Sequence, residues 1–168
     1  MVSDDFIEQC GLPFFAHRLR RLSELFVEQS GTWLVVLGLK VPPRAVSTVL
    51  LLAERQPLTI TEIAAALRFS HPLIIKLVRD LASLALVRLD QDSGDGRQRL
   101  VRLTRRGIEE AERLRQANDA MAHAYRSLFA AANANGLECI ERIECAVRDN
   151  SLLERLRVQS VPTRKTKK

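Results

Sequence analysis

The sequence has few aromatic residues and no long apolar run. Aromatic side chains make up 5% of the 168 residues, whereas leucine, alanine and arginine recur throughout, a bias that favours helices over a strand-rich sandwich. The longest apolar run, residues 33–39, is broken by Gly38 and is far shorter than the roughly 20 residues that cross a bilayer. We therefore expect one mainly helical domain that does not enter a membrane.

Cysteine and histidine are also scarce. The three cysteines, Cys10, Cys139 and Cys145, include no close pair, so neither a disulfide framework nor a Cys-x-x-Cys metal site is expected. The chain lacks a glycine-rich phosphate loop, a His-Glu-x-x-His motif and a Gly-x-Ser-x-Gly motif. We expect no enzyme, no metal and no cofactor. The acidic start at Asp4 and Asp5 differs from a secretory signal, which favours a cytoplasmic protein with reduced thiols.

The positive charge is concentrated in the middle of the chain and at its end. The net charge is +6, and residues 41–107 contain 11 basic and 6 acidic side chains. Residues 161–168 form a short basic tail that we expect to be disordered. The flanking segments are slightly acidic, so the charge pattern favours a phosphate-facing centre.

Apolar periodicity predicts helices before and within this basic centre. The first stripe begins at Leu12 and continues through Phe15, Leu19, Leu22 and Phe26; a kink or end is expected at residues 30–32. A second helix should run from Arg44 and stop before Pro57. Thr59 and Glu62 form a predicted capping box, and the short helix after it should turn Ile63, Ala66 and Leu67 inward.

A second short helix follows at once, with Ser70 as its cap and Pro72 in its first turn. Its apolar residues Ile74, Leu77, Val78 and Leu81 share one face. Two helices joined by so short a turn predict a helix-turn-helix. The alternating runs 85–89 and 100–103 then predict a hairpin. Thr104 should cap a long helix, and the stripe from Cys139 to Val147 marks a last helix.

The order of these elements resembles a known family of regulators. The residues that carry the likeness are Leu58-Thr59-Ile60-Thr61-Glu62-Ile63-Ala64, Leu67, Ser70, Pro72, Leu77-Val78, Leu86-Val87, Asp95-Gly96-Arg97, Leu103-Thr104 and Gly107. Over about residues 12–157 the chain resembles a MarR-type winged helix-turn-helix regulator. The expected fold is mainly α with a two-stranded β wing, flanked by N- and C-terminal dimerisation helices.

The resemblance implies a division of the chain and a set of partners. Residues 1–40 would be an N-terminal dimerisation region, 41–107 the DNA-binding domain, 108–160 the C-terminal dimerisation helices and 161–168 the tail. The apolar stripes at both chain ends have no partner in the small central domain, which independently favours a two-fold mate. The expected protein is a homodimer on a pseudo-palindromic duplex operator, more a repressor than an activator.

Specific residues are expected to contact DNA. The second helix of a helix-turn-helix presents its N-terminal residues to the major groove. Arg97 would enter the minor groove, with Asp95 orienting its guanidinium, and other hairpin arginines would meet phosphates. The full candidate set is Ser70, His71, Pro72, Leu73, Ile75, Lys76, Arg79, Arg88, Asp95, Arg97 and Arg99, with Arg102 and Arg105 as further phosphate contacts.

Alternatives remain open for these residues. His71 and Lys76 suit base edges, and Leu73 and Ile75 would suit thymine methyl groups. If the helix were rotated, both aliphatic residues would instead belong to the core. A hairpin arginine could equally lie on a solvated face, and a winged helix that binds protein in place of DNA is a second functional class.

Regulation is less clearly encoded. By resemblance, a small aromatic or amphipathic effector would bind between the dimerisation helices and the winged domain. Residues of suitable chemistry are His17, Arg18, Arg21, Trp33 and Arg44, each of which could instead be structural or solvated. A thiol-based redox sensor using Cys10, with Cys139 or Cys145 as its partner, is the alternative, although Glu8 nearby disfavours a thiolate.

Overall fold

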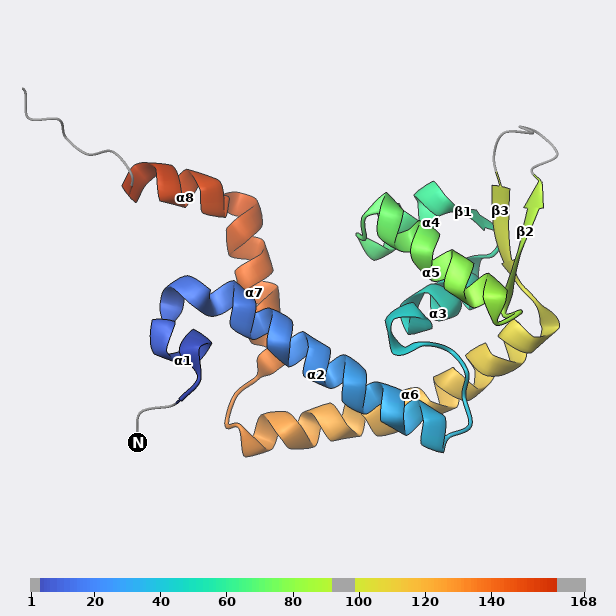
Figure 1. Ribbon diagram of the computed structural model, residues 1–168, viewed down its shortest axis with the longest axis horizontal. Helices are drawn as coiled ribbons and strands as arrows, with labels where there is room; N and C mark the ends of the chain where they lie inside the picture. Colours follow the sequence, from blue (N-terminus) through green and yellow to red (C-terminus); the bar gives the residue numbers. More distant parts are fainter. Residues whose placement is uncertain (1–3, 92–98, 160–168) are drawn as a thin grey trace, which may run out of the picture. The chain divides into compact units, whose positions relative to one another are not determined.

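A computed structural model describes residues 4–91 and 99–159. The chain divides into two compact units, residues 1–118 and residues 119–168, which are considered separately. In Figure 1 the elements are α1 (Phe6–Cys10), η1 (Leu12–Phe14), α2 (Phe15–Val36), η2 (Pro43–Ala45), α3 (Val46–Arg55), β1 (Leu58–Thr59), α4 (Ile60–Leu67), α5 (His71–Ser83), β2 (Val87–Gln91), β3 (Arg99–Leu103), α6 (Arg105–Ala131), α7 (Gly136–Asp149) and α8 (Leu152–Gln159). The prediction of a mainly helical winged fold is confirmed. The prediction of a disordered tail lies outside the described residues.

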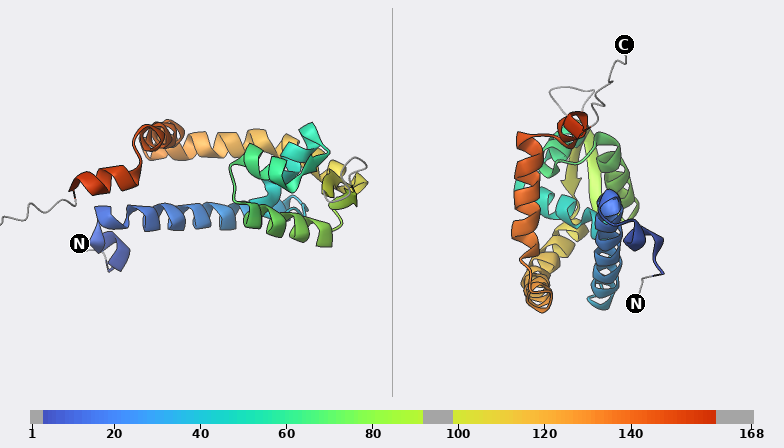
Figure 2. Two further views of the ribbon diagram at one scale, coloured as in Figure 1. Left: turned by 90° about the horizontal axis from the view of Figure 1, so that it is seen from above. Right: turned by 90° about the vertical axis from the view of Figure 1, so that its left-hand side faces the viewer.

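Helix α2 is continuous across the position where a break was expected. The sequence Ser30-Gly31-Thr32 predicts a kink, but the helix runs to Val36, and Figure 2 shows it as a single rod. Leu34 is buried in the core beyond this point, so tertiary packing outweighs the low helix propensity of the segment. A side chain at Gly31 would lie 3.0 Å from Pro43 Cγ, so the missing Cβ lets the η2 turn pack closely.

The core of the first unit lies among α3, α4, α5, the sheet and the start of α6. Val49, Leu52, Ile63, Ile74 and Leu81 are fully buried there. Their spacing gives each short helix one apolar face, and burying a leucine or isoleucine side chain stabilises the fold by about 1.5–3 kcal/mol. Helix α6 contributes Ala111 and Leu114 to this core, and Leu34 of α2 and Leu39 after it extend it.

The capping box of α4 is confirmed, but its inward face is partly corrected. Thr59 Oγ1 accepts from the Glu62 backbone amide at 3.2 Å, and the Glu62 carboxylate accepts from the Thr59 amide at 2.7 Å. These hydrogen bonds hold the pKa of Glu62 below its ordinary value. Ile63 is buried as expected, whereas Ala66 is exposed and Ala64 takes its place in the core.

The sheet has three strands in the order β1-β3-β2, all antiparallel. The hairpin of β2 and β3 is the predicted wing, with Val87 opposite Leu103 and Leu89 opposite Val101. Strand β1 was not predicted, because two residues are too few to show an alternating pattern. It places Leu58 on the other side of Val101, which is fully buried between them.

A compact junction joins the hairpin to α6. The Thr104 hydroxyl accepts from the Gly107 amide at 3.0 Å, as expected for a cap, and donates to the Ala85 carbonyl at 2.7 Å. The Thr104 amide donates to the Leu86 carbonyl at 3.0 Å. Gly107 passes so close to Leu86 that a Cβ would lie 2.0 Å from this carbonyl oxygen. The Leu-Thr-x-x-Gly motif therefore fixes where the wing ends and the helix begins.

Two side chains of α6 bind the segment that follows α2. The Glu110 carboxylate, 6% exposed, accepts from the backbone amides of Lys40 and Val41 at 2.9 and 3.4 Å. Arg113 donates to the carbonyls of Leu37 and Gly38. Since buried backbone groups need partners, these two residues hold an irregular segment about 70 positions away in sequence against the helix.

The second unit contains the end of α6 and two further helices. The sequence predicted one last helix, but α7 ends at Asp149 and α8 follows. Ser151 Oγ accepts from the Glu154 amide at 3.2 Å, and the Glu154 carboxylate accepts from the Ser151 amide at 2.8 Å. This is a second capping box, and its hydrogen bonds lower the pKa of Glu154.

Candidate nucleic-acid interface

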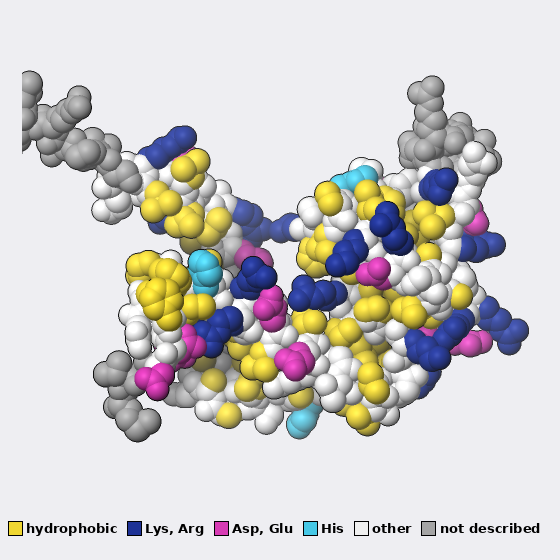
Figure 3. Space-filling model, viewed as in Figure 1, with side chains coloured by type: hydrophobic (Ala, Val, Ile, Leu, Met, Phe, Trp, Pro, Cys, Tyr) yellow, Lys and Arg dark blue, Asp and Glu magenta, His cyan; other side chains and the backbone are white. Residues whose placement is uncertain are grey.

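Helix α5 presents a mixed basic and apolar face to solvent. Ile74, Leu77, Val78 and Leu81 are at most 4% exposed, which fixes the rotation of the helix. The candidate contact residues outside this stripe are all exposed: His71, Pro72, Leu73, Ile75, Lys76 and Arg79. The alternative in which Leu73 and Ile75 belong to the core is therefore wrong. Figure 3 shows basic side chains beside hydrophobic ones over α4 and α5.

The start of α5 differs from the expected cap in one respect. Ser70 occupies the N-cap position, and its carbonyl accepts from the Ile74 amide at 3.1 Å. Its side chain makes no capping hydrogen bond. Pro72 lies in the first turn as predicted, where it leaves no helical hydrogen bond unmade.

His71 is held by a residue that the sequence reasoning did not single out. His71 Nε2 lies 3.3 Å from Thr61 Oγ1, so the imidazole of α5 is hydrogen-bonded to the first turn of α4. Both residues are exposed. Because the hydroxyl can donate or accept, it accommodates either neutral tautomer of the ring. Thr61 lies two residues after the end of β1, and only the tertiary fold brings it to His71.

Arg68, an exposed basic residue beside α5, was not among the candidate DNA contacts. It ends α4 in the left-handed conformation, with φ 53°, in the short turn before α5. Its side chain is exposed. Glycine or asparagine more commonly occupies such a position, so the sequence pattern does not predict the left-handed conformation of this arginine.

The outer face of the hairpin carries two opposed arginines. Arg88 on β2 pairs directly with Arg102 on β3, on the side opposite the buried Val87 and Val101. Like charges in this arrangement repel. Asp90 lies between them, with its carboxylate 3.4 Å from the Arg88 guanidinium and 3.3 Å from that of Arg102. Asp90 was not anticipated, because its role depends on strand register.

The remaining candidate DNA contacts are distributed around the hairpin. Arg99 is exposed at the start of β3. Arg105 is exposed on α6 and forms an ion pair with Glu109 at 3.3 Å. Asp95 and Arg97, the predicted wing-tip pair, lie outside the described residues.

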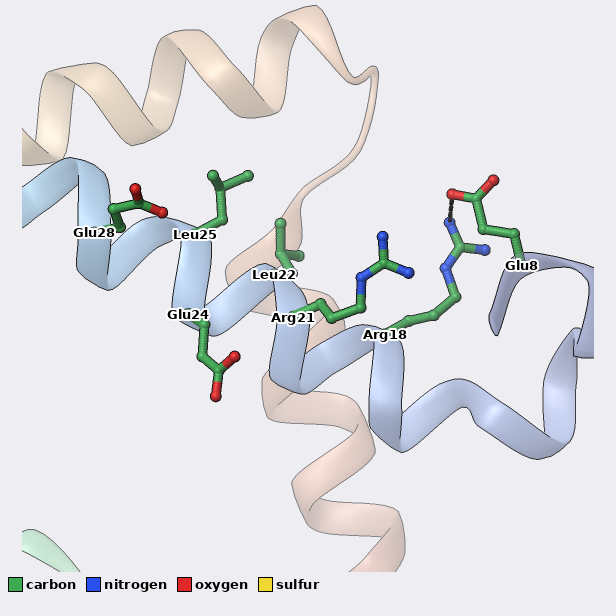
Figure 4. A pocket seen from close by; sticks show the side chains of 7 residues that line it. All are labelled: Glu8, Arg18, Arg21, Leu22, Glu24, Leu25 and Glu28. Carbon is green, nitrogen blue, oxygen red and sulfur yellow. Dashed lines mark ion pairs between the residues drawn. The ribbon is translucent and has the colours of Figure 1, made fainter. Parts of the chain in front are cut away.

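The five candidate effector residues do not converge on one site. Arg18 and Arg21 line a pocket of about 440 Å³ along α2 with Glu8, Leu22, Glu24, Leu25 and Glu28 (Figure 4). His17, Trp33 and Arg44 do not line it. The His17 ring lies 5.1 Å from that of Phe14, Trp33 packs against the core, and Arg44 is exposed on η2.

Both arginines of this pocket are already paired with carboxylates. Arg18 lies 3.6 Å from Glu8, and Arg21 lies 2.6 Å from Asp5. Hydrogen bonds from Arg21 and from the first turn of α1 lower the pKa of Asp5. An aromatic carboxylate that entered here would compete with these carboxylates for the arginines.

The structure offers limited support for thiol chemistry. Cys10 ends α1 and is partly buried. Cys139 and Cys145 are exposed on α7, where the Arg148 guanidinium lies 3.2 Å from the Cys145 sulfur.

Over residues 4–91 and 99–159, no group of three potential metal ligands is assembled. Within the same ranges, no helix combines the length and apolar content needed to span a membrane.

Comparisons with known proteins support the winged-helix reading. Residues 38–98 match the family model described as MarR family. The structure is similar to S. aureus MepR in a complex with DNA, with a TM-score of 0.58 and 21% identity over 80% of this chain and 94% of that chain. It is also similar to the adhesin competence repressor AdcR of Streptococcus pyogenes, with a TM-score of 0.56 and 20% identity over 80% and 96% of the two chains. A probable transcriptional regulator from Pseudomonas aeruginosa gives a TM-score of 0.55 and 21% identity over 77% and 92%. No curated protein matches the sequence.

Proposed function

We propose that the protein is a MarR-family, sequence-specific, duplex-DNA-binding regulator of transcription with no enzymatic activity; the MarR family model matches residues 38–98. The observation that carries the proposal is the exposed face of α5, where His71, Lys76 and Arg79 project from a helix whose opposite face is buried. A helix of this kind fits the major groove of B-DNA. The similar MepR structure is a DNA complex.

The hairpin would supply contacts to the backbone and the minor groove. Among residues 4–91 and 99–159, Arg88 and Arg102 share one carboxylate, that of Asp90, so a phosphate can complete their charge pairing. Arg97 lies in the same hairpin sequence and is proposed to enter the minor groove, where arginine responds to groove width and negative potential. Ser70, Asp95 and Arg99 are proposed as supporting contacts.

We propose a homodimer as the working form. Phe15, Leu19, Leu22 and Leu25 are each 44–47% exposed on α2, and Ile140, Ile143 and Val147 form a similar exposed stripe on α7. Stripes of this kind are stabilised by a second copy. Two identical winged domains would then bind a pseudo-palindromic operator, with half-sites spaced by the dimer. The proposed location is the cytoplasm.

We further propose that the protein is a repressor that a small effector releases from DNA. The pocket beside Arg18 and Arg21 also holds the apolar side chains of Leu22 and Leu25, so an amphipathic acid could bind there by displacing Glu8 and Asp5 from the two guanidinium groups. Such a ligand acts only through its different affinities for the two conformations, typically a coupling of about 1–3 kcal/mol. His17, Trp33 and Arg44 are left without a role in this pocket.

The test of DNA binding compares two variants on two kinds of DNA. A preferred duplex is first selected from a random library, and affinities for it and for an unrelated duplex are measured over a range of salt concentrations. Arg97→Ala should weaken both and reduce the salt slope by about one unit per lost phosphate-type contact. His71→Ala should cost about 1–3 kcal/mol on the selected duplex and less on the unrelated one.

Controls separate the competing functions. Arg20→Ala changes an arginine on α2 that already pairs with Glu24 and should leave both affinities unchanged. If wild-type protein showed no salt-dependent binding to any duplex, the protein-interaction module would become the better hypothesis. Benzoate, an aromatic carboxylate, is the probe for the effector model and should weaken the affinity of the protein for the selected duplex. If peroxide released the DNA and Cys10→Ser abolished that release, the redox alternative would replace the effector model.

A further inference from the structure

We propose that α5 reads the 5-methyl groups of thymine through Leu73 and Ile75, so that each half-site of the preferred DNA carries thymine at the positions these side chains meet. The inference rests on the proposed function and adds a specificity-determining contact. This contact would give a role to two exposed aliphatic side chains, which a helix face in contact with water alone does not require.

The rotation of α5 sets where these side chains point. Leu73 is 36% and Ile75 is 40% exposed, while Ile74 between them is fully buried. At 3.6 residues per turn, Leu73 and Ile75 fall on opposite edges of the exposed face. Lys76 and Arg79, both exposed, fall between those edges. The face therefore has a cationic centre with an aliphatic side chain on each side.

The same pattern argues against a protein partner on this face. Cores of protein interfaces are depleted of lysine, and protein-binding sites are marked by contiguous apolar patches. Here Lys76 and Arg79 separate the two aliphatic residues. A major groove offers both chemistries at once, because phosphates surround it and thymine is the only standard base that presents a methyl group there.

The position of both residues along α5 fits base contact. Leu73 and Ile75 are the third and fifth residues of the helix, and the N-terminal residues of a recognition helix are those that reach base edges. His71, at the first position, is held through Thr61. The polar contact and the two apolar contacts would therefore address neighbouring base pairs.

The experiment removes single methyl groups from the DNA. A duplex selected by the wild-type dimer is synthesised with deoxyuridine in place of each thymine in turn, which deletes the methyl and leaves base pairing intact. Dissociation constants are measured at fixed salt. Burying one methyl group corresponds to about a fourfold change in affinity. We expect such a loss at one or two thymines per half-site.

Protein variants assign each methyl to a side chain. Leu73→Ala should weaken binding to the thymine duplex and abolish the effect of deoxyuridine at one position, and Ile75→Ala should do so at another. Ile108→Ala, at a 53% exposed residue of α6, is the matched control and should preserve every deoxyuridine effect. Circular dichroism establishes that each variant is folded.

Distinct results overturn distinct claims. Selective binding with no deoxyuridine effect, or a selected site without thymine in the half-sites, overturns methyl reading and leaves the proposed function intact. Deoxyuridine effects that persist in both variants overturn the assignment to Leu73 and Ile75. Absence of any preferred duplex overturns the proposed function itself, and the inference fails with it.

Discussion

Replacing Gly107 by alanine should destabilise the protein, even though alanine is the better residue in an isolated helix. Gly107 lies in the first turn of α6, where a Cβ would be 2.0 Å from the Leu86 carbonyl oxygen and 3.1 Å from Leu103 Cδ2. Comfortable contacts to carbon are about 3.5 Å. The first of these neighbours is backbone, so the junction between hairpin and helix must open by roughly 1.5 Å.

The magnitude follows from what that opening disturbs. The hydrogen bonds from Thr104 to the carbonyls of Leu86 and Ala85, at 3.0 and 2.7 Å, contribute about 1 kcal/mol each. Overpacking a close contact costs about 1–3 kcal/mol. The helix-propensity gain of alanine over glycine is at most about 1 kcal/mol. We therefore expect Gly107→Ala to lower the free energy of unfolding by about 2–4 kcal/mol.

Urea unfolding followed by circular dichroism at fixed protein concentration measures this difference. The matched control is Gly31→Ala in the interior of α2, where the nearest atom is a proline ring carbon at 3.0 Å that can yield by a few tenths of an ångström. That variant should stay within about 1 kcal/mol of wild type, because propensity and crowding nearly cancel. A Gly107→Ala protein as stable as wild type would refute the reasoning.

Three further outcomes are expected. Leu22→Asp, at a 47% exposed position of the α2 stripe, should dissociate the dimer in sedimentation experiments, because the seam would bury an unpaired carboxylate; an unchanged dimer would contradict the proposed seam. Glu110→Ala should cost about 1–3 kcal/mol by leaving two backbone amides without their acceptor, and Glu110→Gln, which keeps an acceptor, should cost less in thermal unfolding. In an NMR titration, the pKa of the Glu62 carboxyl should lie below its ordinary value. Its contribution to stability should therefore be full above the unfolded-chain pKa of about 4.3 and be lost as pH falls through the folded-state pKa; Thr59→Ala should return that pKa towards normal.

The rotation of α5 was favoured by the sequence, because its four core residues recur at helical spacing, but the exposed aliphatic residues Leu73 and Ile75 left a rotated helix open until the structure showed their exposure. The shorter α4 gave less information. Ala64, Ala65 and Ala66 are adjacent in an eight-residue helix, and three equal side chains do not reveal which one is buried. Periodicity needs contrast between positions as well as length.

Other differences arose where tertiary contacts override local preference. Gly31 permits the approach of Pro43 without breaking α2, so a residue that predicts a break serves a packing role. Helix α8 was missed although Ser151 and Glu154 carry its capping signal, because the short helix offers few periodic positions. The pairing of Asp90 with two arginines depends on strand register, which the sequence did not specify.

The proposed effector site was the least predictable feature. Chemical suitability selected Arg18 and Arg21, which line a pocket, but it could not reveal that Glu8 and Asp5 already pair with them. It also grouped Trp33 with them, although its ring packs against the core. Residue type identifies what a side chain can bind, whereas the fold decides whether a neighbouring residue already binds it.

The contacts of Glu110 and Arg113 with residues 37–41 also have a consequence for synthesis of the chain. Their partners are separated by 69 to 76 positions, so at about 5–20 residues per second the earlier segment waits on the order of 4 to 15 seconds before its binding partners are translated. During that interval the amides of Lys40 and Val41 rely on water. The nascent winged helix can therefore close around its full set of contacts only after the first turns of α6 have left the ribosome.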